Sequence, residues 1–179
     1  MEATAHILRE EGYSQLNTNY IATKAGISIG SLYQYFPNKE TIIAELHRQH
    51  FKKARDEMKK AYQQMEGLSF DAASRLLLES TIKVHQIDPK LHRVMSTQIP
   101  ILNLSEDDSS SHSVRKILEQ FFYAHKDSLR PNLDIPLAAH ISYQLVISVT
   151  HAAVIDEPEL LNNPKFVDEL LRMLLLYVH

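Results

Sequence analysis

The segment TNYIATKAGISIGSLYQYFPNK, residues 18–39, decides the fold of this chain. It opens as a short helix whose small apolar residues, Ile21, Ala22 and Ala25, allow close packing against a neighbour. Gly26 comes next, and glycine readily adopts the left-handed backbone that a tight turn requires. A second short helix follows the turn and ends before the proline. Two short helices joined by a glycine turn predict a helix-turn-helix, whose second helix fits the major groove of DNA.

The rest of the chain is expected to be helical, because β-rich folds need frequent turns that contain glycine. All four glycines lie within the first 67 residues, and apolar residues recur at helical spacing throughout. The sequence therefore predicts an all-α protein, with an N-terminal three-helix helix-turn-helix domain and a C-terminal antiparallel helical bundle that dimerises. The first domain is expected to cover residues 1–46, with its linking helix continuing to about 65, and the second to cover 47–179.

Capping residues and helix breakers place the individual helices. We expect Gly12 to end the first helix, and Thr18, Ser28 and Asn38 to cap the next three. The stretch SEDDSSSHS, residues 105–113, is typical of a mobile polar loop. The first expected helix ends at Glu11, and the others cover residues 18–24, 29–36, 40–65, 69–86, 89–98, 113–127, 134–155 and 164–178.

Composition excludes several classes of protein. Hydrophobic residues make up 44% of the chain and charged residues 23%, which suits a folded globular protein. The absence of cysteine excludes disulfides, thiolate metal sites and cysteine nucleophiles. No apolar run reaches the roughly 20 residues of a membrane span, and the charged opening MEATAHILREEG lacks the apolar region of a signal peptide. A cytoplasmic protein without a membrane partner is therefore expected.

The net charge of −3 is unevenly distributed along the chain. Residues 1–60 carry nine Lys and Arg against seven Asp and Glu, whereas the excess is acidic over residues 61–179. The sign of this modest asymmetry places a polyanionic partner at the N-terminal end.

At fixed spacing over about 40 residues, the sequence resembles the TetR family of transcriptional regulators. The positions that carry the resemblance are Gly12-Tyr13, Thr18, Ile21-Ala22, Ala25-Gly26-Ile27-Ser28, Gly30-Ser31-Leu32-Tyr33, Tyr35-Phe36 and Asn38-Lys39. The resemblance implies a ligand-responsive regulator, expected to be a repressor, that binds a palindromic DNA operator as a homodimer. A small, largely apolar effector would release it. Members of the family carry a short basic arm before the first helix, whereas this sequence opens at Met1-Glu2.

The resemblance and the side-chain chemistry together indicate which residues touch DNA. Thr18 would hold a phosphate at a helix N-terminus, Tyr35 would lie along the sugar-phosphate backbone, and Lys39 would pair with a phosphate. Gln34 can read adenine, and Ile29 can contact a thymine methyl group. The expected DNA contacts are Thr18, Ser28, Ile29, Ser31, Tyr33, Gln34, Tyr35 and Lys39. The core of this domain is expected to contain Ile21, Ala22, Leu32 and Phe36.

Two stretches in the second domain are apolar beyond the needs of one helix face. LAAHISYQLVISVTHAAVI, residues 137–155, is apolar or small nearly all round, and residues 166–178 become so near their end. A helix that is hydrophobic on every side must be covered on every side. We expect a four-helix interface with a second copy, where the resembled family dimerises; a buried monomer core is the alternative. The expected interface residues are Leu145, Val149, Phe166, Leu170, Met173 and Tyr177.

The effector is expected in a cavity with apolar walls and a few polar groups. The expected lining residues are Met95, Ile99, Phe121, Phe122, His125, Tyr143 and Gln144, with Tyr123 and His140 as comparable candidates. No cofactor is expected.

Two other classes of function compete with the regulator. His85 and His92 are seven residues apart, and with Asp88 they suggest a metal-dependent hydrolase. Pro89 intervenes, however, and no HExxH spacing, nucleophile motif or phosphate loop is present, so we expect neither a catalytic residue nor a metal. The second alternative is an architectural or interaction module that keeps the helix-turn-helix without a ligand response.

Overall fold

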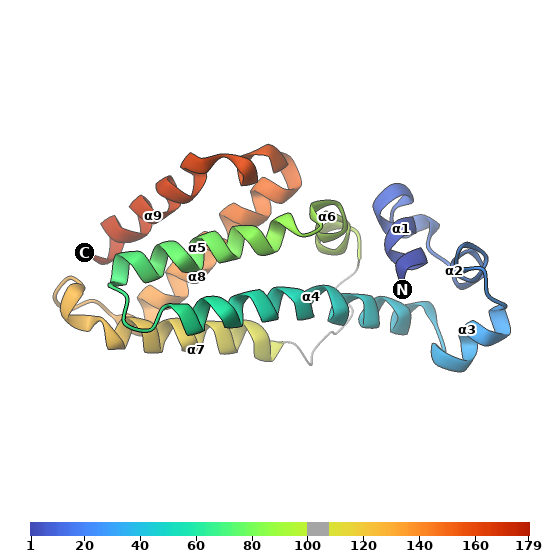
Figure 1. The fold of residues 1–179 in the computed structure, drawn as a ribbon, viewed down its shortest axis with the longest axis horizontal. Coiled ribbons are helices and arrows are strands. Elements are labelled where there is room, and N and C mark those ends of the chain that lie inside the picture. The colour runs from blue at the N-terminus through green and yellow to red at the C-terminus, as the bar shows by residue number, and fades with distance from the viewer. Residues whose placement is uncertain (100–107) are drawn as a thin grey trace. The chain divides into compact units, whose positions relative to one another are not determined.

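The computed structural model describes residues 1–99 and 108–179, and the side chains of 108–113 are not described. Within this part of the chain there are nine α-helices, three short 3₁₀ turns and no strand (Figure 1). These residues divide into two compact units: unit 1 comprises 1–55 and 88–99, and unit 2 comprises 56–87 and 108–179. The prediction of an all-α fold is confirmed.

Unit 1 is built from short helices around one apolar core. Its elements are α1 (Glu2–Glu11), α2 (Thr18–Ala25), α3 (Ile29–Tyr35), the first part of α4 (Lys39–Gln64) and α6 (Pro89–Thr97). The core joins all five through Ala5, Ile7, Leu8, Leu16, Ile21, Ala22, Leu32, Ile42, Ile43, Leu46, Leu91 and Val94. Ile21, Ala22 and Leu32 are buried there and Phe36 packs against them, as the sequence predicted.

Polar contacts fasten α6 to α1 within unit 1. The Nε of Arg9 donates to Asp88 Oδ2 at 2.8 Å, and the other carboxylate oxygen of Asp88 caps α6 by accepting from the Leu91 N–H at 3.1 Å. Beyond α1, the N–H of Tyr13 donates to Gln98 Oε1 at 3.0 Å. Asp88 therefore caps α6 and at the same time bonds to Arg9 on α1.

Unit 2 is a bundle of longer helices. It contains α5 (Phe70–Gln86), α7 (Asp108–Ala124), α8 (Ile135–Asp156), α9 (Pro164–Val178) and the last residues of α4. One core cluster gathers around Phe70, Phe121 and Phe122, and a second gathers α5, α8 and α9 around Leu78, Val154 and other residues. Helix α5 packs against both α8 and α9, which lie side by side.

Small polar residues start most of these helices. Asn17, Ser28, Ser69, Asp88, Asp134 and Asn163 each accept a hydrogen bond from a backbone N–H in the first turn. The predicted caps Ser28 and Asn38 are confirmed, because Asn38 Oδ1 accepts from the Thr41 N–H at 2.9 Å. The prediction for Thr18 is wrong by one residue: Asn17 is the cap, and Thr18 is the first helical residue.

The predicted polar loop at residues 105–113 is also wrong in part. Helix α7 begins at Asp108, so residues 108–113 are helical, while 105–107 lie outside the described residues. Serine and aspartate favour the first turn of a helix as well as loops, because their side chains satisfy the exposed N–H groups there. The remaining predicted helices match the structure to within a few residues.

Helix α8 is apolar on more than its packed face. Among the described residues, only α8 is long and apolar enough to span a membrane. Such a helix is also found in the core of soluble proteins. Part of this apolar surface stays exposed in the single chain, at Leu137, Ile141 and Val149.

Candidate nucleic-acid interface

Helices α2 and α3 are connected by a tight turn whose geometry depends on glycine. Gly26 has φ 67° and ψ 30°, the left-handed conformation that costs a glycine no Cβ clash. The N–H of Ile27 reaches back to the Ala22 carbonyl at 3.0 Å, which closes the end of α2. Ser28 then begins α3 by accepting from the Ser31 N–H at 3.0 Å. The chain reverses within three residues, as a helix-turn-helix requires.

Helix α3 buries one residue and exposes the side chains that would face DNA. Leu32 is in the core, whereas Tyr33 is 50% exposed, Tyr35 is 79% exposed and Gln34 lies between them on the surface. Tyrosine is enriched at interfaces, because its ring buries a large apolar area there while its hydroxyl can hydrogen-bond. Ile29, by contrast, is half-buried and packs against the core.

The hydroxyl groups on this face are already arranged in pairs. Thr18 Oγ1 lies 3.1 Å from the Tyr33 hydroxyl, so the first residue of α2 is bonded to the middle of α3. The hydroxyls of Ser28 and Ser31 lie 2.8 Å apart at the start of α3. Hydroxyls donate and accept in turn, so each pair can present a donor to a phosphate oxygen.

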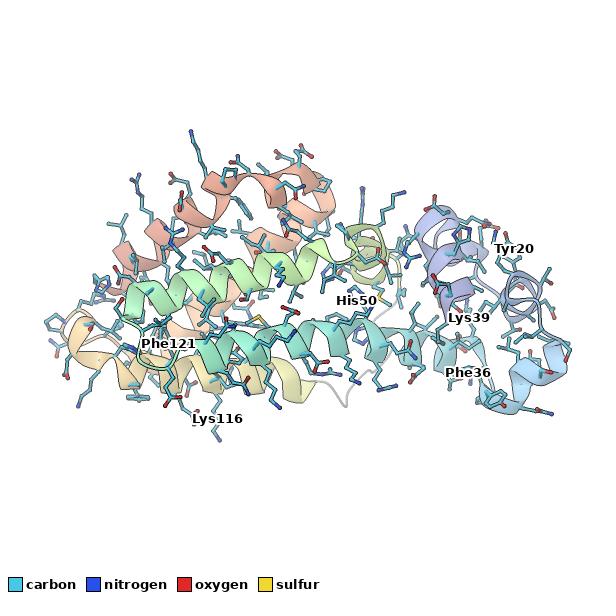
Figure 2. All side chains as sticks on the ribbon, viewed as in Figure 1. Tyr20, Phe36, Lys39, His50, Lys116 and Phe121 are labelled. Carbon is cyan, nitrogen blue, oxygen red and sulfur yellow. The ribbon has the colours of Figure 1, made fainter. Side chains whose placement is uncertain are left out.

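Lys39 lies at the first turn of α4, where Figure 2 labels it. Its Nζ is 4.3 Å from the centre of the Tyr13 ring, a cation–π contact. This contact holds the ammonium group near the N-terminus of α4. Because the Lys39 side chain is already restricted by this contact, it would lose less conformational entropy when its ammonium group binds a phosphate.

Two further contacts orient the surface of α2. Tyr20, also labelled in Figure 2, donates through its hydroxyl to Glu11 Oε1 at 2.8 Å. This hydrogen bond is the main reason that the pKa of Tyr20 is raised, since ionised tyrosine could not donate it. Lys24 lies over the same ring, with 5.9 Å from Nζ to the ring centre.

Sequence reasoning did not assign roles to Asn17, Tyr13 or Tyr20. Asn17 caps α2, Tyr13 holds Lys39, and Tyr20 bonds to Glu11. A signal existed for Asn17, because asparagine is as good a cap as threonine and stands one position earlier. Tyr13 and Tyr20 gave no signal, since their partners come from other helices.

The residues predicted to line an effector pocket are divided between the two units. Met95 and Ile99 pack against the core of unit 1. Phe121, Phe122 and His125 belong to unit 2, where Phe70 and Phe121 stack at 5.0 Å between ring centres. There they fill the core. Tyr143 is half-buried near Tyr62, and Gln144 is exposed.

Of the predicted dimer residues, one is misplaced. Leu170 is 2% exposed and packs with α5 and α8 in the chain's own core, so it does not line an outer surface. Leu145, Phe166 and Tyr177 are half-buried, whereas Val149 and Met173 are exposed. The exposed large apolar side chains of α8 and α9 are Leu137, Ile141, Val149, Met173 and Leu176, and we call these five residues the α8–α9 apolar surface.

Asp88, weighed above as a catalytic acid, has a structural role. Its two oxygens are committed to Arg9 and to the Leu91 N–H. The surface also carries an open groove of about 720 Å³ between α5 and α9, lined by Arg75, Asp168, Glu169, Leu171, Arg172, Leu175, Leu176 and His179. None of the predicted effector-pocket residues lines it.

Two family models match the chain. Residues 1–46 match the bacterial regulatory proteins of the tetR family, and residues 69–177 match the tetracyclin repressor-like C-terminal domain. The fatty acid metabolism regulator protein of Bacillus subtilis (strain 168) is 37% identical over 49 residues. That match spans 27% of this chain and 25% of the relative, so it covers about a quarter of each.

Solved structures share the fold over nearly the whole chain. The fatty acid degradation regulator FadR from Bacillus halodurans superimposes with a TM-score of 0.73 at 21% identity, covering 97% of this chain and 91% of its own. FadR from Bacillus subtilis, solved in complex with stearoyl-CoA, gives 0.71 at 20% identity, covering 99% and 97%. The ketosteroid transcriptional regulator KstR2 of Mycobacterium tuberculosis gives 0.71 at 19%, covering 99% and 91%. At these identities the likeness shows the fold.

Proposed function

The chain belongs to the TetR family of bacterial regulatory proteins, and we propose that it is a ligand-responsive repressor that binds a palindromic operator as a homodimer. It is a transcriptional regulator and not an enzyme. The observation that carries the proposal is the turn at Gly26 between α2 and α3, with Tyr33 and Tyr35 exposed on the outer side of α3.

Operator recognition would use the exposed side of α3 and the ends of two neighbouring helices. Thr18 at the start of α2 and Lys39 at the start of α4 would fix phosphates, and helix N-termini favour that charge. Tyr33, Gln34 and Tyr35 would enter or border the major groove. The half-buried position of Ile29 makes it the weakest member of the predicted set.

A palindromic operator requires two copies related by a twofold axis, because each chain supplies one recognition helix. The α8–α9 apolar surface supports such a dimer: Met173 is 51% and Leu176 79% exposed. Large apolar groups grouped on one face are typical of an interface. A homodimer in the cytoplasm, where the operator DNA is, follows from the proposal.

The effector would be small and largely apolar, and we propose a fatty acyl derivative. The support from the comparisons is that the B. subtilis neighbour binds stearoyl-CoA. The support within unit 2 is three buried hydroxyls, of Ser74, Ser142 and Thr150, that have no hydrogen-bond partner among the described residues. A buried hydroxyl without a partner costs about 1–3 kcal/mol, which a polar group of the effector would recover.

Binding of the effector would lower operator affinity by linkage. An effector that binds better to the form not competent for DNA weakens DNA binding by the same factor, commonly about 5- to 150-fold. Within the described part of unit 1, α6 and the first part of α4 share one core with α2 and α3, so a displacement of either helix would shift the DNA-binding residues.

The test is fluorescence anisotropy with fragments recovered by selecting genomic DNA on the purified protein. We expect a palindrome to be enriched, bound tightly at physiological salt, and released by stearoyl-CoA but not by free CoA. Equal affinity for the palindrome and a scrambled duplex would exclude operator recognition. Tight operator binding that no acyl derivative changes would favour the architectural or interaction module.

A further inference from the structure

Two histidines from distant parts of the sequence meet inside unit 2. His85 on α5 is 5% exposed, and His151 on α8 is half-buried. Their ring centres lie 5.1 Å apart, edge to face, and a ring nitrogen of one is within 4.8 Å of a ring nitrogen of the other. Neither residue has a role in the DNA-binding or dimer surfaces described above.

The hydrogen bond of His85 fixes which of its nitrogens carries the proton. Its Nδ1 lies 2.7 Å from the carbonyl oxygen of Thr81, one turn earlier on α5. A carbonyl oxygen can only accept, so Nδ1 donates and Nε2 carries the lone pair in the neutral ring. Metal-binding histidines are oriented in the same way, with one nitrogen donating to a carbonyl and the other directed at the ion.

Burial disfavours the protonated form of both rings, and metals bind the neutral form. Burial lowers the pKa of His85 below its ordinary value. Burial and the nearby His85 lower the pKa of His151. Metal ions displace protons from histidine, so a ring that is already neutral binds without that competition.

The spacing of the rings fits one shared ion. When two imidazoles bind a tetrahedral Zn²⁺ at about 2.0–2.1 Å, their ring centres are roughly 5 Å apart. The observed separation is 5.1 Å. We propose that His85 and His151 form a site for a divalent transition metal such as Zn²⁺, which joins α5 to α8. Imidazole favours zinc, copper and nickel over magnesium and calcium.

His85 and His151 would fill two positions on the ion. A tetrahedral Zn²⁺ has four positions, and water or a donor atom of another molecule can take the remaining ones. The site does not depend on the identity of the effector, and it stands even if the regulator answers to no acyl derivative.

The test is calorimetric titration of untagged, chelator-treated protein with ZnCl₂, and with MgCl₂ as the comparison ion. The informative variant is His151→Gln, and the matched control is His140→Gln, which removes an exposed histidine from the same helix. We expect one Zn²⁺ site per chain in the wild type and in His140→Gln. We expect binding at least tenfold weaker in His151→Gln, and no binding of Mg²⁺ by any of the three.

Thermal unfolding gives a second measurement. Zn²⁺ should raise the Tm of the wild type and of His140→Gln, but not that of His151→Gln, because a ligand that binds the folded form stabilises it. Wild-type affinity for Zn²⁺ in His151→Gln, or no Zn²⁺ binding in the wild type, would overturn the proposal. If His151→Gln fails to fold, NMR of the wild type decides, because the Nε2 resonance of His85 must shift on stoichiometric Zn²⁺.

Discussion

The hydroxyls of Thr18 and Tyr33 lie 3.1 Å apart and share a hydrogen bond. Thr18 opens α2 and Tyr33 lies in the middle of α3, so this bond sets how the two helices present their polar groups on one face. The phenol keeps half of its surface exposed while its hydroxyl is held in place. A group that is oriented before binding loses less freedom when it contacts DNA.

Replacing Tyr33 by phenylalanine should weaken operator binding by roughly 2- to 12-fold. The substitution removes one hydroxyl, and a neutral hydrogen bond contributes about 0.5–1.5 kcal/mol. Thr18→Val should have a similar effect, and the double variant should lose less than the sum, because the two hydroxyls act together. Tyr123→Phe, on the exposed surface of α7, is the control. Operator affinities by anisotropy that match the wild type would remove Tyr33 from the interface.

Replacing Lys39 by alanine should weaken binding to every DNA sequence and lower the salt dependence. Each phosphate contact made by a lysine releases about one condensed cation, so the slope of log K against log salt should fall by about one unit. Lys165→Ala on α9 serves as the control, since it removes an equal charge from unit 2. An unchanged slope in Lys39→Ala would mean that Lys39 stays on the Tyr13 ring in the complex.

Charges placed on the α8–α9 apolar surface should produce a folded monomer. Met173→Glu with Leu176→Glu adds two carboxylates at exposed positions, so each chain should keep its helicity while its pairing is lost. Leu170→Glu should instead unfold the protein, because Leu170 is in the core. Tyr123→Glu, an exposed apolar position on α7, should leave the dimer intact. Sedimentation velocity with circular dichroism distinguishes these outcomes, and a dimer in the double variant would contradict the interface.

Gly12→Ala should destabilise the protein by roughly 1–2 kcal/mol, since φ is positive there and alanine pays for that conformation. Gly12 has φ 81°, and an added Cβ would lie 2.8 Å from Gln98 Oε1. In the double variant Gly12→Ala/Gln98→Ala, stability should recover only by the part of the loss that comes from the steric clash with Gln98. Gly30→Ala is the matched control: its Cβ meets only Ser28 Oγ at 3.8 Å, and alanine favours a helix. Urea unfolding that shows no loss for Gly12→Ala would rule out strain at this position.

Tyr62 should titrate near pH 12, two units above an ordinary tyrosine. Burial is the main cause of its raised pKa, and the neighbouring Tyr143 adds to it. Between about pH 10 and 12 the unfolded chain loses this proton and the folded chain keeps it, so stability should fall as pH rises through that window. The difference in absorbance at 295 nm between wild type and Tyr62→Phe should show the late step. In urea, the unfolded chain should ionise Tyr62 near pH 10. Ionisation of Tyr62 near pH 10 in the folded protein as well would refute the prediction.

Local signals made most of the fold predictable. A cap, a glycine turn and a helical period each act within a few residues, which is why Ser28, Asn38 and the turn at Gly26 agree with the structure. The predictions that failed at helix ends did so where two interpretations of the same residues were equally good. Asn17 and Thr18 are adjacent and both can cap, and the serine-rich run before residue 113 suits a helix start as well as a loop.

Contacts between distant residues could not be predicted. Leu170 and Leu176 lie on one helix and look alike in sequence, but only the first is buried in the core that α9 forms with α5 and α8. His85 was considered with His92 on spacing alone, and no local pattern pointed to His151, whose ring lies 5.1 Å from that of His85. The effector pocket was equally hard to predict, because side chains that line a pocket and side chains that fill a core have the same composition.

The place of α6 in unit 1 bears on how hybrid sensors can be made from this chain. Suppose that the DNA-binding head of this chain is grafted onto another sensor by cutting within α4 alone. Helix α1 would then lose the apolar cover of Leu91 and Val94, and Arg9 would lose its partner Asp88. The graft would then expose the core of the head to solvent and lose an ion pair that is partly shielded from water. The exchangeable part is therefore discontinuous: residues 1–55 together with the segment that starts at Asp88.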